Sequence, residues 1–483
     1  MNMPEDVKFI LDALHARGHE AYAVGGCVRD SLLGREPEDW DVTTSAEPEE
    51  VKEVFPVTID TGIEHGTVTV RLHKTNYEVT TFRTDGEYKD HRHPEEVSFA
   101  KTLEEDLLRR DFTINAMAYS EESGIVDLYG GQQDLADGVI RCVGDPGERF
   151  EEDALRILRA FRFAAQLPGR LAPDQGDRSE DRCFTIEPAT REAIRVCRDG
   201  LRYISAERIQ VEMTKILTSP HPDILRDMYD LGVTEIILPE FDPMMETEQH
   251  FIHHDKTVGE HTLCALANIE SSKVLRWTML LHDTGKPKSK VTDEDGNDHF
   301  RGHAELSTGI ADEVMNRMKM DNATRDTVKR LVLYHDYRIP IEGIDIYKGK
   351  LIDKESEINA AGEDLDCINE RRVRRALNRI GEEYFDDYCK VRRADVLAQS
   401  MYKRKEKLAN LNTVEEIAAG VLAKKQCVSL RDLAVTGQDL IGEGVKPGPE
   451  IGAILGQMLD WVIDEPELND REALLTRWRE ERS

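Results

Sequence analysis

The spacing of apolar residues changes near Gly144, and this change constrains the chain to two kinds of architecture in succession. Before it, the segments GTVTVRL (66–72) and YEVTTF (77–82) alternate β-branched and polar residues, which is typical of paired strands. After it, segments such as ALRILRAFRFAAQL and TRDTVKRLVLYH place apolar residues at helical spacing. A chain of 483 residues is also too long for one hydrophobic core. We therefore predict the α+β class, with a mixed-sheet domain first and all-α domains after it.

Charge and cysteine usage narrow the class of protein further. The net charge of −31 argues against general affinity for nucleic acid, so RNA binding would need a local concentration of Lys and Arg. No run of about 18 apolar residues is present, and the first residues lack the basic region and cleavage site of a signal peptide. Eight cysteines without a C-x-x-C pair fit reduced thiols. We expect a cytoplasmic protein that binds no membrane.

A glycine pair stands between a predicted strand and a predicted helix in AYAVGGCVRDSLLGREPEDWDVTT (21–44). Glycines let the backbone approach an anion closely, and the amides at a helix N-terminus donate hydrogen bonds to it. Arg29, in the first turn of that helix, adds a charge-assisted contact to a triphosphate. A glycine pair by itself is more often a simple turn, so the residues downstream decide between the two interpretations.

Two aspartates, Asp39 and Asp41, follow one residue apart. On a strand such residues point to the same face, where two carboxylates repel each other unless a divalent cation lies between them. Mg²⁺ takes oxygen ligands of this kind together with phosphate oxygens. Two such ions activate an attacking hydroxyl and stabilise the leaving oxygen. Glu78 is a candidate third carboxylate from a neighbouring strand; the alternative is a polar strand edge.

The whole stretch resembles the nucleotidyltransferase signature of the class II tRNA CCA-adding enzymes and the bacterial poly(A) polymerases, within the polymerase-β superfamily. The resemblance implies that Gly26 and Arg29 contact the triphosphate. It also implies that Asp39 and Asp41 are catalytic and hold Mg²⁺. The expected substrates are CTP, ATP and tRNA, and no DNA.

Two later motifs match the same family in order. EEDLLRRDFTINAMAY (104–119) implies that Arg110 binds nucleotide and that Asp111 and Asn115 shape the ribose pocket. The alternative for this motif is a helix start with Asp111 as N-cap.

FEEDALRILRAFRFAAQL (150–167) resembles the family's base-selecting motif. Asp153 and Arg156 lie three residues apart, hence on one face of a helix. An acceptor beside a guanidinium group imitates a base-pairing edge that accepts C and A. The resemblance adds Arg159 and Arg162 as nucleotide contacts; the alternative is an ordinary surface ion pair.

Two further segments bear on the comparison with the family. FRTDGEYKDHRHPEEVSF (82–99) resembles the flexible loop needed for the switch from C to A addition, which favours complete CCA addition. The Pro/Gly-rich stretch 168–183 is a departure from the family pattern and is expected to form an exposed insertion.

Histidines gather between residues 250 and 336, and they resemble the metal-binding residues of the HD phosphohydrolase superfamily, whose domains are helical. His261, His282 and Asp283 match well; His303 and His335 match less closely, and Asp336 is a weaker candidate. The implied activity is metal-assisted hydrolysis of phosphate esters, with a second divalent metal as cofactor. The alternative is a scaffold without activity.

A basic region lies within the acidic chain: residues 370–407 hold twelve Lys or Arg against seven Asp or Glu. Arg371, Arg374 and Arg375 can share one side of a helix, and we predict that they contact RNA phosphates without reading sequence. The alternative is a solvated helix surface.

These observations predict four domains. They are a nucleotidyltransferase head (1–142), a helical neck and body for base selection and RNA binding (143–240), an HD domain (241–345) and a helical tRNA-binding tail (346–483). The predicted function is template-independent addition of CCA to tRNA. The alternatives are a poly(A) polymerase or partial-adding enzyme, and an HD-type phosphohydrolase.

Overall fold

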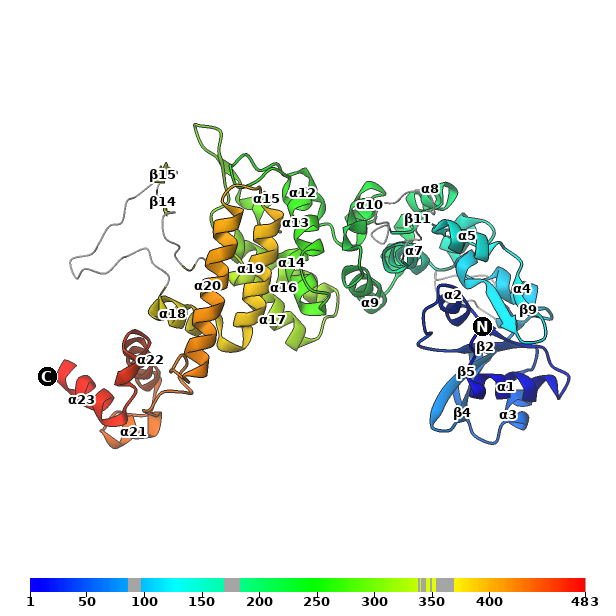
Figure 1. Cartoon of the computed structure of the whole chain (residues 1–483), viewed down its shortest axis with the longest axis horizontal. Coiled ribbons are helices and arrows are strands. Elements are labelled where there is room, and N and C mark those ends of the chain that lie inside the picture. Colours follow the sequence, from blue (N-terminus) through cyan, green and yellow to red (C-terminus); the bar gives the residue numbers. More distant parts are fainter. Residues whose placement is uncertain are drawn as a thin grey trace. The chain divides into compact units, whose positions relative to one another are not determined.

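The structure is a computed structural model that describes residues 1–85, 97–168, 183–337, 339, 345–347, 350–352 and 369–482 (Figure 1). The chain divides into two compact units, described here one at a time. The first comprises Met1–Asp242 with Arg317–Lys319, and the second comprises Pro243–Asn316 with Met320–Ser483.

The first unit begins with a seven-stranded mixed sheet in the order β3-β4-β5-β2-β1-β8-β9. Neighbouring strands are antiparallel except β2 and β5, which run parallel. The strands are β1 (Ala21–Val24), β2 (Asp41–Thr44), β3 (Thr58–Gly62), β4 (Thr67–Leu72), β5 (Thr75–Thr81), β8 (Met117–Ser120) and β9 (Gly124–Asp127). The predicted mixed-sheet domain is confirmed.

Helices α1 (Glu5–His15) and α3 (Pro48–Val54) pack on one face of this sheet. The apolar stripe of α1 is buried, and so are the valines that β2, β4 and β5 turn towards it, Val42, Val68, Val70 and Val79. Because side chains alternate along a strand, Asp41, Thr69 and Glu78 point to the opposite face. Helices α2 (Gly26–Leu32) and α4 (Leu103–Leu108) contribute residues near that opposite face.

The rest of the first unit is mainly helical, with α5 (Gly131–Asp137), α6 (Pro146–Glu152), α7 (Leu155–Gln166), α8 (Pro188–Cys197), α9 (Ala206–Leu217), α10 (Leu225–Asp230) and α11 (Thr234–Ile237). Short strands β10 (Val139–Ile140) and β11 (Thr185–Ile186) pair in parallel, and β6 (Arg83–Asp85) pairs with β7 (Val97–Phe99). Residues 86–96 of the predicted flexible loop and residues 169–182 of the predicted insertion lie outside the described residues.

The second unit is helical apart from short hairpins, as predicted for the C-terminal half. Its helices are α12 (Asp242–Glu246, whose first residue belongs to the first unit), α13 (Val258–Ala267), α14 (Lys273–Leu281), α15 (Lys286–Ser289), α16 (His303–Arg317), α17 (Asn322–Tyr334), α18 (Glu370–Ile380), α19 (Phe385–Ala398), α20 (Arg404–Ala423), α21 (Gly437–Gly442), α22 (Pro449–Asp464) and α23 (Arg471–Glu481). Residues from α21, α22 and α23, among them Leu440, Met458 and Trp478, form a separate core cluster. Among the described helices, none has the length and hydrophobicity needed to cross a membrane.

Candidate functional site

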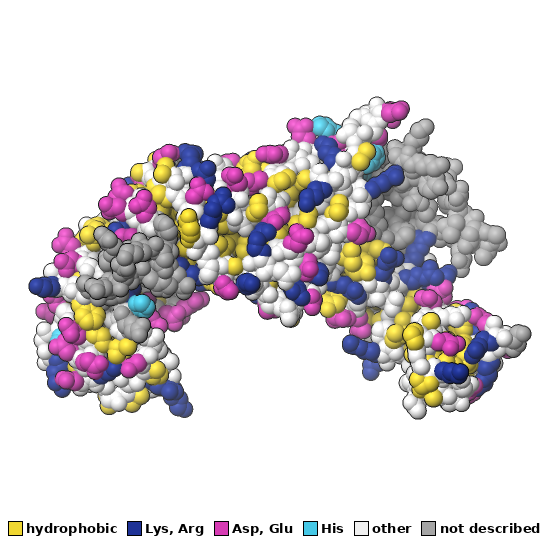
Figure 2. Space-filling model, turned by 180° about the vertical axis from the view of Figure 1, so that it is seen from behind, with side chains coloured by type: hydrophobic (Ala, Val, Ile, Leu, Met, Phe, Trp, Pro, Cys, Tyr) yellow, Lys and Arg dark blue, Asp and Glu magenta, His cyan; other side chains and the backbone are white. Residues whose placement is uncertain are grey.

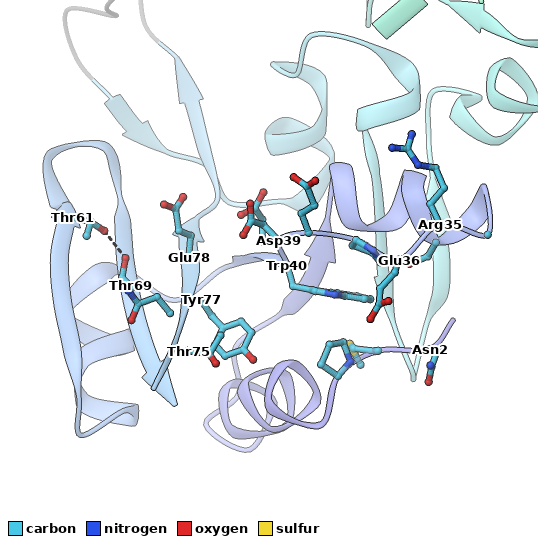
Figure 3. A pocket seen from close by; sticks show the side chains of 18 residues that line it. Asn2, Arg35, Glu36, Asp39, Trp40, Thr61, Thr69, Thr75, Tyr77 and Glu78 are labelled. Carbon is cyan, nitrogen blue, oxygen red and sulfur yellow. Dashed lines mark hydrogen bonds between the residues drawn. The ribbon is translucent and has the colours of Figure 1, made fainter. Parts of the chain in front are cut away.

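A group of carboxylates lies on the sheet face opposite α1. The register pairs Val42 with Val79, so Asp41 on β2 lies beside Glu78 on β5. Asp39, Asp41 and Glu78 line a pocket of about 1060 Å³, part of which Figure 3 shows with Asp39 and Glu78 labelled. Burial raises the pKa of Asp41, the negative charge of Glu78 raises it further, and Arg110 opposes both effects. Like charges held this close fit the binding of a divalent cation by oxygen ligands.

The glycine turn brings two arginines to the edge of this carboxylate group. Gly25 has φ +82°, and a Cβ placed there would lie 3.0 Å from Nη1 of Arg110. Glycine therefore permits both the turn and the close approach of the guanidinium group. From the helix that follows, Nη1 of Arg29 donates to Oδ1 of Asn115 at 2.6 Å. Arg29 of the glycine-turn motif and Arg110 and Asn115 of the motif at 104–119 thus lie close together beside the turn.

Asp111 is the centre of a buried network and not the N-cap of a helix. Its Oδ1 accepts hydrogen bonds from the Phe112 amide at 2.8 Å and from Nδ2 of Asn115 at 3.0 Å. Its Oδ2 accepts two from Arg159, at 2.8 and 2.6 Å. Burial would raise the pKa of Asp111, but Arg159 and Asn115 hold it below its ordinary value. The helix-start alternative is wrong, because a single 3₁₀ turn at Thr113–Asn115 leads into strand β8.

The predicted base-selecting residues lie at a break between two helices. Asp153 has φ −145° between α6 and α7, so it does not share a continuous helix with Arg156 as the spacing suggested. Its carboxylate accepts from Nη2 of Arg208 at 2.7 Å. Arg156 donates to Glu152 and, through Nη2, to the carbonyl of Arg109 at 3.1 Å. Asp153 and Arg156 are therefore each oriented by a different partner.

The Phe163 ring contacts three arginines. The sequence did not predict this role, because Phe163 has the apolar character of an ordinary core residue. The guanidinium carbons of Arg162, Arg29 and Arg159 lie 4.3, 5.0 and 5.4 Å from the ring centroid. Nε of Arg162 is also 3.1 Å from Oε2 of the buried Glu212. Burial and the nearby Arg159 lower the pKa of Arg162 to about 10. The ring lies among three guanidinium groups, each of which also pairs with a carboxylate: Arg29 with Asp30, Arg159 with Asp111 and Arg162 with Glu212.

Asp106 is a second residue that sequence reasoning missed. Its side chain is fully buried on α4, and it accepts hydrogen bonds from Arg109 at 2.7 Å, from Arg110 at 3.3 Å and from Thr43 on β2 at 3.1 Å. Burial would raise the pKa of Asp106, but Arg110 and Arg109 lower it. This carboxylate therefore fixes Arg110 to the strand that carries Asp41.

We expect Asp106→Asn to raise the KM for nucleoside triphosphate about tenfold, since a hydrogen bond to a charged group is worth roughly that factor. The substitution removes the charge that orients Arg110 and keeps the shape. Steady-state kinetics at varied CTP measure it, with Asp12→Asn on the exposed side of α1 as the control. An unchanged KM together with a lower kcat would show that Asp106 does not act through nucleotide binding.

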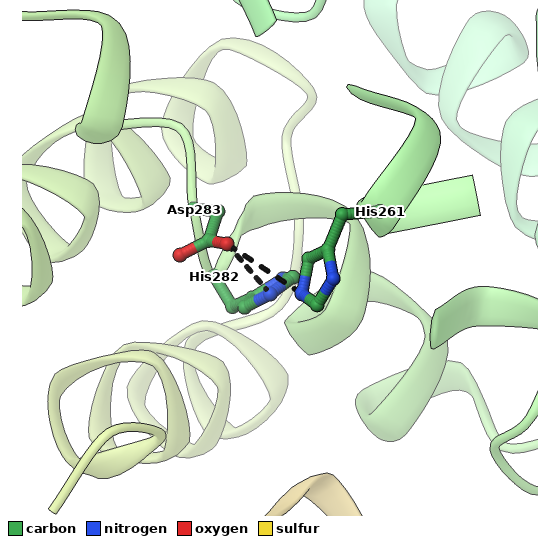
Figure 4. A group of neighbouring side chains, drawn as sticks. All are labelled: His261, His282 and Asp283. Carbon is green, nitrogen blue, oxygen red and sulfur yellow. Dashed lines mark ion pairs between the residues drawn. The ribbon is translucent and has the colours of Figure 1, made fainter. Parts of the chain in front are cut away.

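The histidine cluster forms in the second unit, where four helix ends converge. His261 lies on α13, His282 and Asp283 follow α14, His303 begins α16, and His335 follows α17. Figure 4 shows His261 and His282 facing Asp283. Nε2 of His282 is 3.2 Å from Oδ2 of Asp283, while Nε2 of His335 and Nε2 of His303 are 3.4 and 3.6 Å from Oδ1. The structure brings all five predicted residues together.

Several ligand atoms of this cluster are buried without a hydrogen bond. Nε2 of His282 and Nδ1 of His261 are in this state, whereas Oδ2 of Asp283 lies 2.7 Å from Nζ of Lys286. Two triads, His261–His282–Asp283 and Asp283–His303–His335, each have ligand atoms within 4.8 Å of one another. Burial would raise the pKa of Asp283, but His282 and Lys286 hold it well below its ordinary value. Imidazole and carboxylate donors in this arrangement fit a transition metal.

Asp395 on α19 is the cluster carboxylate that the sequence did not single out. Its Oδ1 is 3.0 Å from Nε2 of His261, and it is buried. The weaker candidate Asp336 lies instead 3.5 Å from Nη1 of Arg392, which also donates to Asp395 at 3.0 Å. Asp395 was hidden because it lies 112 residues beyond Asp283, within the run KVRRADVLAQ of the basic region.

The three predicted RNA-binding arginines of α18 contact the end of α22. Arg371 and Arg375 both pair with the Asp464 carboxylate, at 2.7 and 2.8 Å. Arg374 has a side chain only 5% exposed and donates through Nε to the carbonyl of Ile463 at 2.7 Å. Arg374 therefore has a packing role, while Arg371 and Arg375 remain about half exposed. On the face seen in Figure 2, basic and acidic side chains are interspersed.

Comparisons with known proteins show the family to which the chain belongs. A family model for the poly(A) polymerase head domain matches residues 21–141, and one described as the "Probable RNA and SrmB- binding site of polymerase A" matches 183–245. A third, for a putative second domain of tRNA nucleotidyltransferase, matches 303–477. The predicted HD domain is not identified by these models.

Some relatives align with nearly the whole of this chain. The CCA-adding enzyme of Levilactobacillus brevis is 33% identical over 98% of each chain. The solved structure of the Bacillus stearothermophilus CCA-adding enzyme in complex with CTP is 27% identical and has a TM-score of 0.68, covering 100% of this chain and 99% of its own. A Thermotoga maritima CCA-adding enzyme complexed with tRNA, 19% identical with a TM-score of 0.53 over 98% of this chain and 94% of its own, shares the fold. The chain therefore belongs to the CCA-adding enzymes, in the class II group that carries a poly(A) polymerase head domain.

Proposed function

We propose that this protein adds and repairs the 3′-terminal CCA of tRNA without a template, using CTP and ATP. The observation that carries the proposal is a group of carboxylates on the head with Arg110 beside it, together with a cluster of arginines that helices α2 and α7 place around Phe163. Asp39, Asp41 and Glu78 gather beside Arg110, while Arg29, Arg159 and Arg162 surround the Phe163 ring. Nucleotidyl transfer needs both, because a metal ion and cationic side chains stabilise charge on the transferred phosphoryl group.

Asp39 and Asp41 would hold Mg²⁺, which when bound activates the attacking hydroxyl and neutralises the departing pyrophosphate. The remaining steps belong to the chain itself. The amides after Gly25, with Arg29 and Arg110, bind the triphosphate and orient it. Asn115 and Asp111 position the ribose, and Phe163 holds the arginines in place.

We propose that Asp153 and Arg156 select the base. Cytosine and adenine both present an amino group beside an unprotonated ring nitrogen, which a carboxylate acceptor and a guanidinium donor complement. Guanine and uracil present the reverse arrangement and leave both groups unpaired. The contacts from Arg208 to Asp153 and from Arg156 to the Arg109 carbonyl support this role, because they fix the two side chains in the absence of a base.

Incubation of the purified protein with CTP, ATP and tRNAs that lack one, two or three terminal residues tests this function. We expect each tRNA to be completed to CCA and extended no further. Addition of C alone or A alone would indicate a partial-adding enzyme, and a long adenosine tail would indicate a poly(A) polymerase.

We also propose the four-domain division predicted from the sequence, with tRNA phosphates contacted by the tail. Arg371 and Arg375 are the proposed contacts, because their side chains are 46% and 54% exposed. Arg374 is better regarded as the residue that ties α18 to α22.

Replacing both Arg371 and Arg375 by alanine is expected to raise the KM for tRNA about tenfold and to lower the salt dependence of binding by roughly two phosphate contacts. The KM for CTP stays unchanged. Addition assays at several salt concentrations measure both constants, and Arg482→Ala near the C-terminus is the control. A tRNA affinity equal to that of the unmodified protein would remove these arginines from the interface.

A second activity is supported by the histidine cluster. We propose that its two triads hold divalent metal and hydrolyse phosphate esters, since buried ligand atoms without hydrogen bonds otherwise carry an unfavourable desolvation cost. Metal analysis of the purified protein by mass spectrometry tests the binding. Metal that is present, and lost with His282→Ala, supports the proposal; a protein that takes up none argues for a scaffold.

A further inference from the structure

The carboxylates of the head border a pocket whose other lining residues have no role in the predicted nucleotide-binding motifs. The pocket at Asp39 and Asp41 is lined further by Thr61, Thr69, Asn76 and Glu78. The residues predicted to bind nucleotide, Gly26, Arg29, Arg110, Asp153, Arg156, Arg159 and Arg162, do not line it. The pocket lining on β3, β4 and β5 is therefore a different set of residues from the predicted nucleotide contacts.

The strand register places the lining residues on one face. Glu78 on β5 pairs with Thr69 on β4, and Asn76 pairs with Arg71. Directly paired side chains of antiparallel strands point to the same face. Thr61 on the edge strand β3 joins this row, because its hydroxyl lies 2.7 Å from that of Thr69.

The exposed members of the row are Thr61, Arg71, Asn76 and Glu78, which we call the acceptor platform. Thr69 is buried, and its hydroxyl bonds to Thr61. When Thr69 donates in this bond, the proton of the Thr61 hydroxyl is left to donate to a ligand. Arg71, which does not itself line the pocket, lies two residues along the strand from Thr69 and adds a cation at the outer end of the row. The platform thus offers hydroxyl and amide groups next to the carboxylates and a positive charge further away.

The geometry of in-line phosphoryl transfer indicates which substrate binds this surface. The attacking and leaving oxygens lie on opposite sides of the reacting phosphorus. With the triphosphate bound at the glycine turn and its arginines, pyrophosphate leaves towards that side. The attacking 3′-hydroxyl must then approach the carboxylates from the side of β5 and β4. An RNA end has sugar hydroxyls at its last nucleotide and a phosphate one nucleotide back, which is the order of groups that the platform offers.

We propose that the acceptor platform binds the 3′-terminal nucleotide of the RNA, with Thr61 contacting its ribose hydroxyls and Arg71 contacting the phosphate that precedes it. The proposal rests on the nucleotidyl transfer proposed above. It assigns the RNA end to β3, β4 and β5, and the incoming triphosphate to α2 and α7.

Two variants of the full-length protein test the proposal in single-turnover and steady-state addition of A to a tRNA ending in CC. Arg71→Glu is expected to raise the KM for tRNA about tenfold and leave the KM for ATP unchanged. Thr61→Val keeps the shape but removes the hydroxyl. It is expected to reduce the preference for a ribose over a 2′-deoxyribose terminus about fivefold, the effect of one neutral hydrogen bond. Arg17→Glu is the charge-matched control, since Arg17 follows α1 on the covered face of the same sheet.

The outcomes separate this proposal from the proposed function. If the unmodified protein adds nucleotides and Arg71→Glu raises the KM for ATP instead, the platform serves the triphosphate and the placement is overturned. An unchanged tRNA KM in Arg71→Glu, or an unchanged terminal-sugar preference in Thr61→Val, also overturns it while CCA addition stands. An unmodified protein that adds no nucleotide overturns both.

Discussion

Replacing Asp41 by asparagine is expected to abolish nucleotide addition, with a loss of about 10³-fold or more in kcat/KM for both CTP and ATP. Asparagine keeps the shape of the side chain but removes the charge that a metal ion requires. The binding of the triphosphate to Arg29 and Arg110 does not depend on this charge, so the dissociation constant for CTP without metal stays near that of the unmodified protein.

Stability provides a second readout for the same variant. Burial and the nearby charges of Glu78 and Asp39 raise the pKa of Asp41, so its ionised form is unfavourable in the folded, metal-free protein. An acid whose pKa is raised by folding destabilises the folded protein as the pH rises and the acid ionises. At neutral pH the uncharged amide in this variant is therefore expected to destabilise the fold no more than the carboxylate of Asp41 does. We expect the thermal midpoint of Asp41→Asn to equal or exceed that of the unmodified protein.

Glu36→Gln is the matched control, because Glu36 lines the same pocket on the loop before the aspartates. It is expected to retain addition within about twofold. An Asp41→Asn protein that remains folded and active would contradict the assignment of the metal site. Loss of activity accompanied by a lower thermal midpoint would point to misfolding, and Asp39→Asn then gives an independent test.

Replacing Asp283 by asparagine is expected to remove bound metal from the histidine cluster and to lower phosphate-ester hydrolysis by about 10³-fold. Asp283 is shared by both triads, so one substitution weakens both. Hydrolysis of p-nitrophenyl phosphate and of a cyclic phosphodiester measures the activity. Addition of CCA by the same preparation is expected to stay within about twofold, since the aspartates of the head are untouched.

The control for Asp283→Asn is a histidine outside the cluster, and the results that would contradict the prediction concern the cluster alone. His299→Ala removes a histidine that pairs with Asp293 on a nearby hairpin and is expected to retain hydrolysis. His303→Ala, at the more exposed edge of the cluster, is a second variant in case the substitution of the buried Asp283 impairs folding. Hydrolysis that persists in Asp283→Asn and His303→Ala would assign the activity elsewhere, and no hydrolysis by the metal-loaded unmodified protein would leave the cluster a scaffold.

The parts of the site that lie on regular local elements were predictable from the sequence. Asp41 begins strand β2 as predicted, but Asp39 lies in the segment before the strand, so the two-residue repeat of a strand does not apply to it; the two aspartates nevertheless line the same pocket. Glu78 follows from the same periodicity on a neighbouring strand. The histidines were grouped because their motifs resemble the metal-binding residues of the HD phosphohydrolases.

The parts that depend on contacts between distant segments were not predictable. Asp395 contacts His261 across 134 residues, and no local periodicity carries that information. Asp106 looked like one acid among several in an acidic helix turn, although its burial makes it the anchor of Arg110. Arg374 was predicted to contact RNA phosphates, but its long side chain is buried and donates to a helix-end carbonyl.

The break at Asp153 shows a further limit of sequence patterns. The run from Phe150 to Leu167 has helical spacing throughout, yet the chain leaves helical geometry at one residue. The Asp153 side chain accepts a hydrogen bond from the amide of Leu155 at 3.0 Å and two from Arg208, at 3.3 and 2.7 Å, which stabilise the break. Aspartate competes with the helix in this way because its short side chain bonds nearby backbone amides.

A crystal structure of the protein soaked with CTP and Mn²⁺ tests the central claim most directly, because manganese is located by its anomalous scattering. We predict a manganese peak within about 2.1 Å of carboxylate oxygens of Asp39 and Asp41, the distance expected for a small divalent ion. The CTP triphosphate should lie on the side of Gly26 and Arg29. Manganese found only at the histidine cluster, or CTP bound away from the two aspartates, would contradict the account.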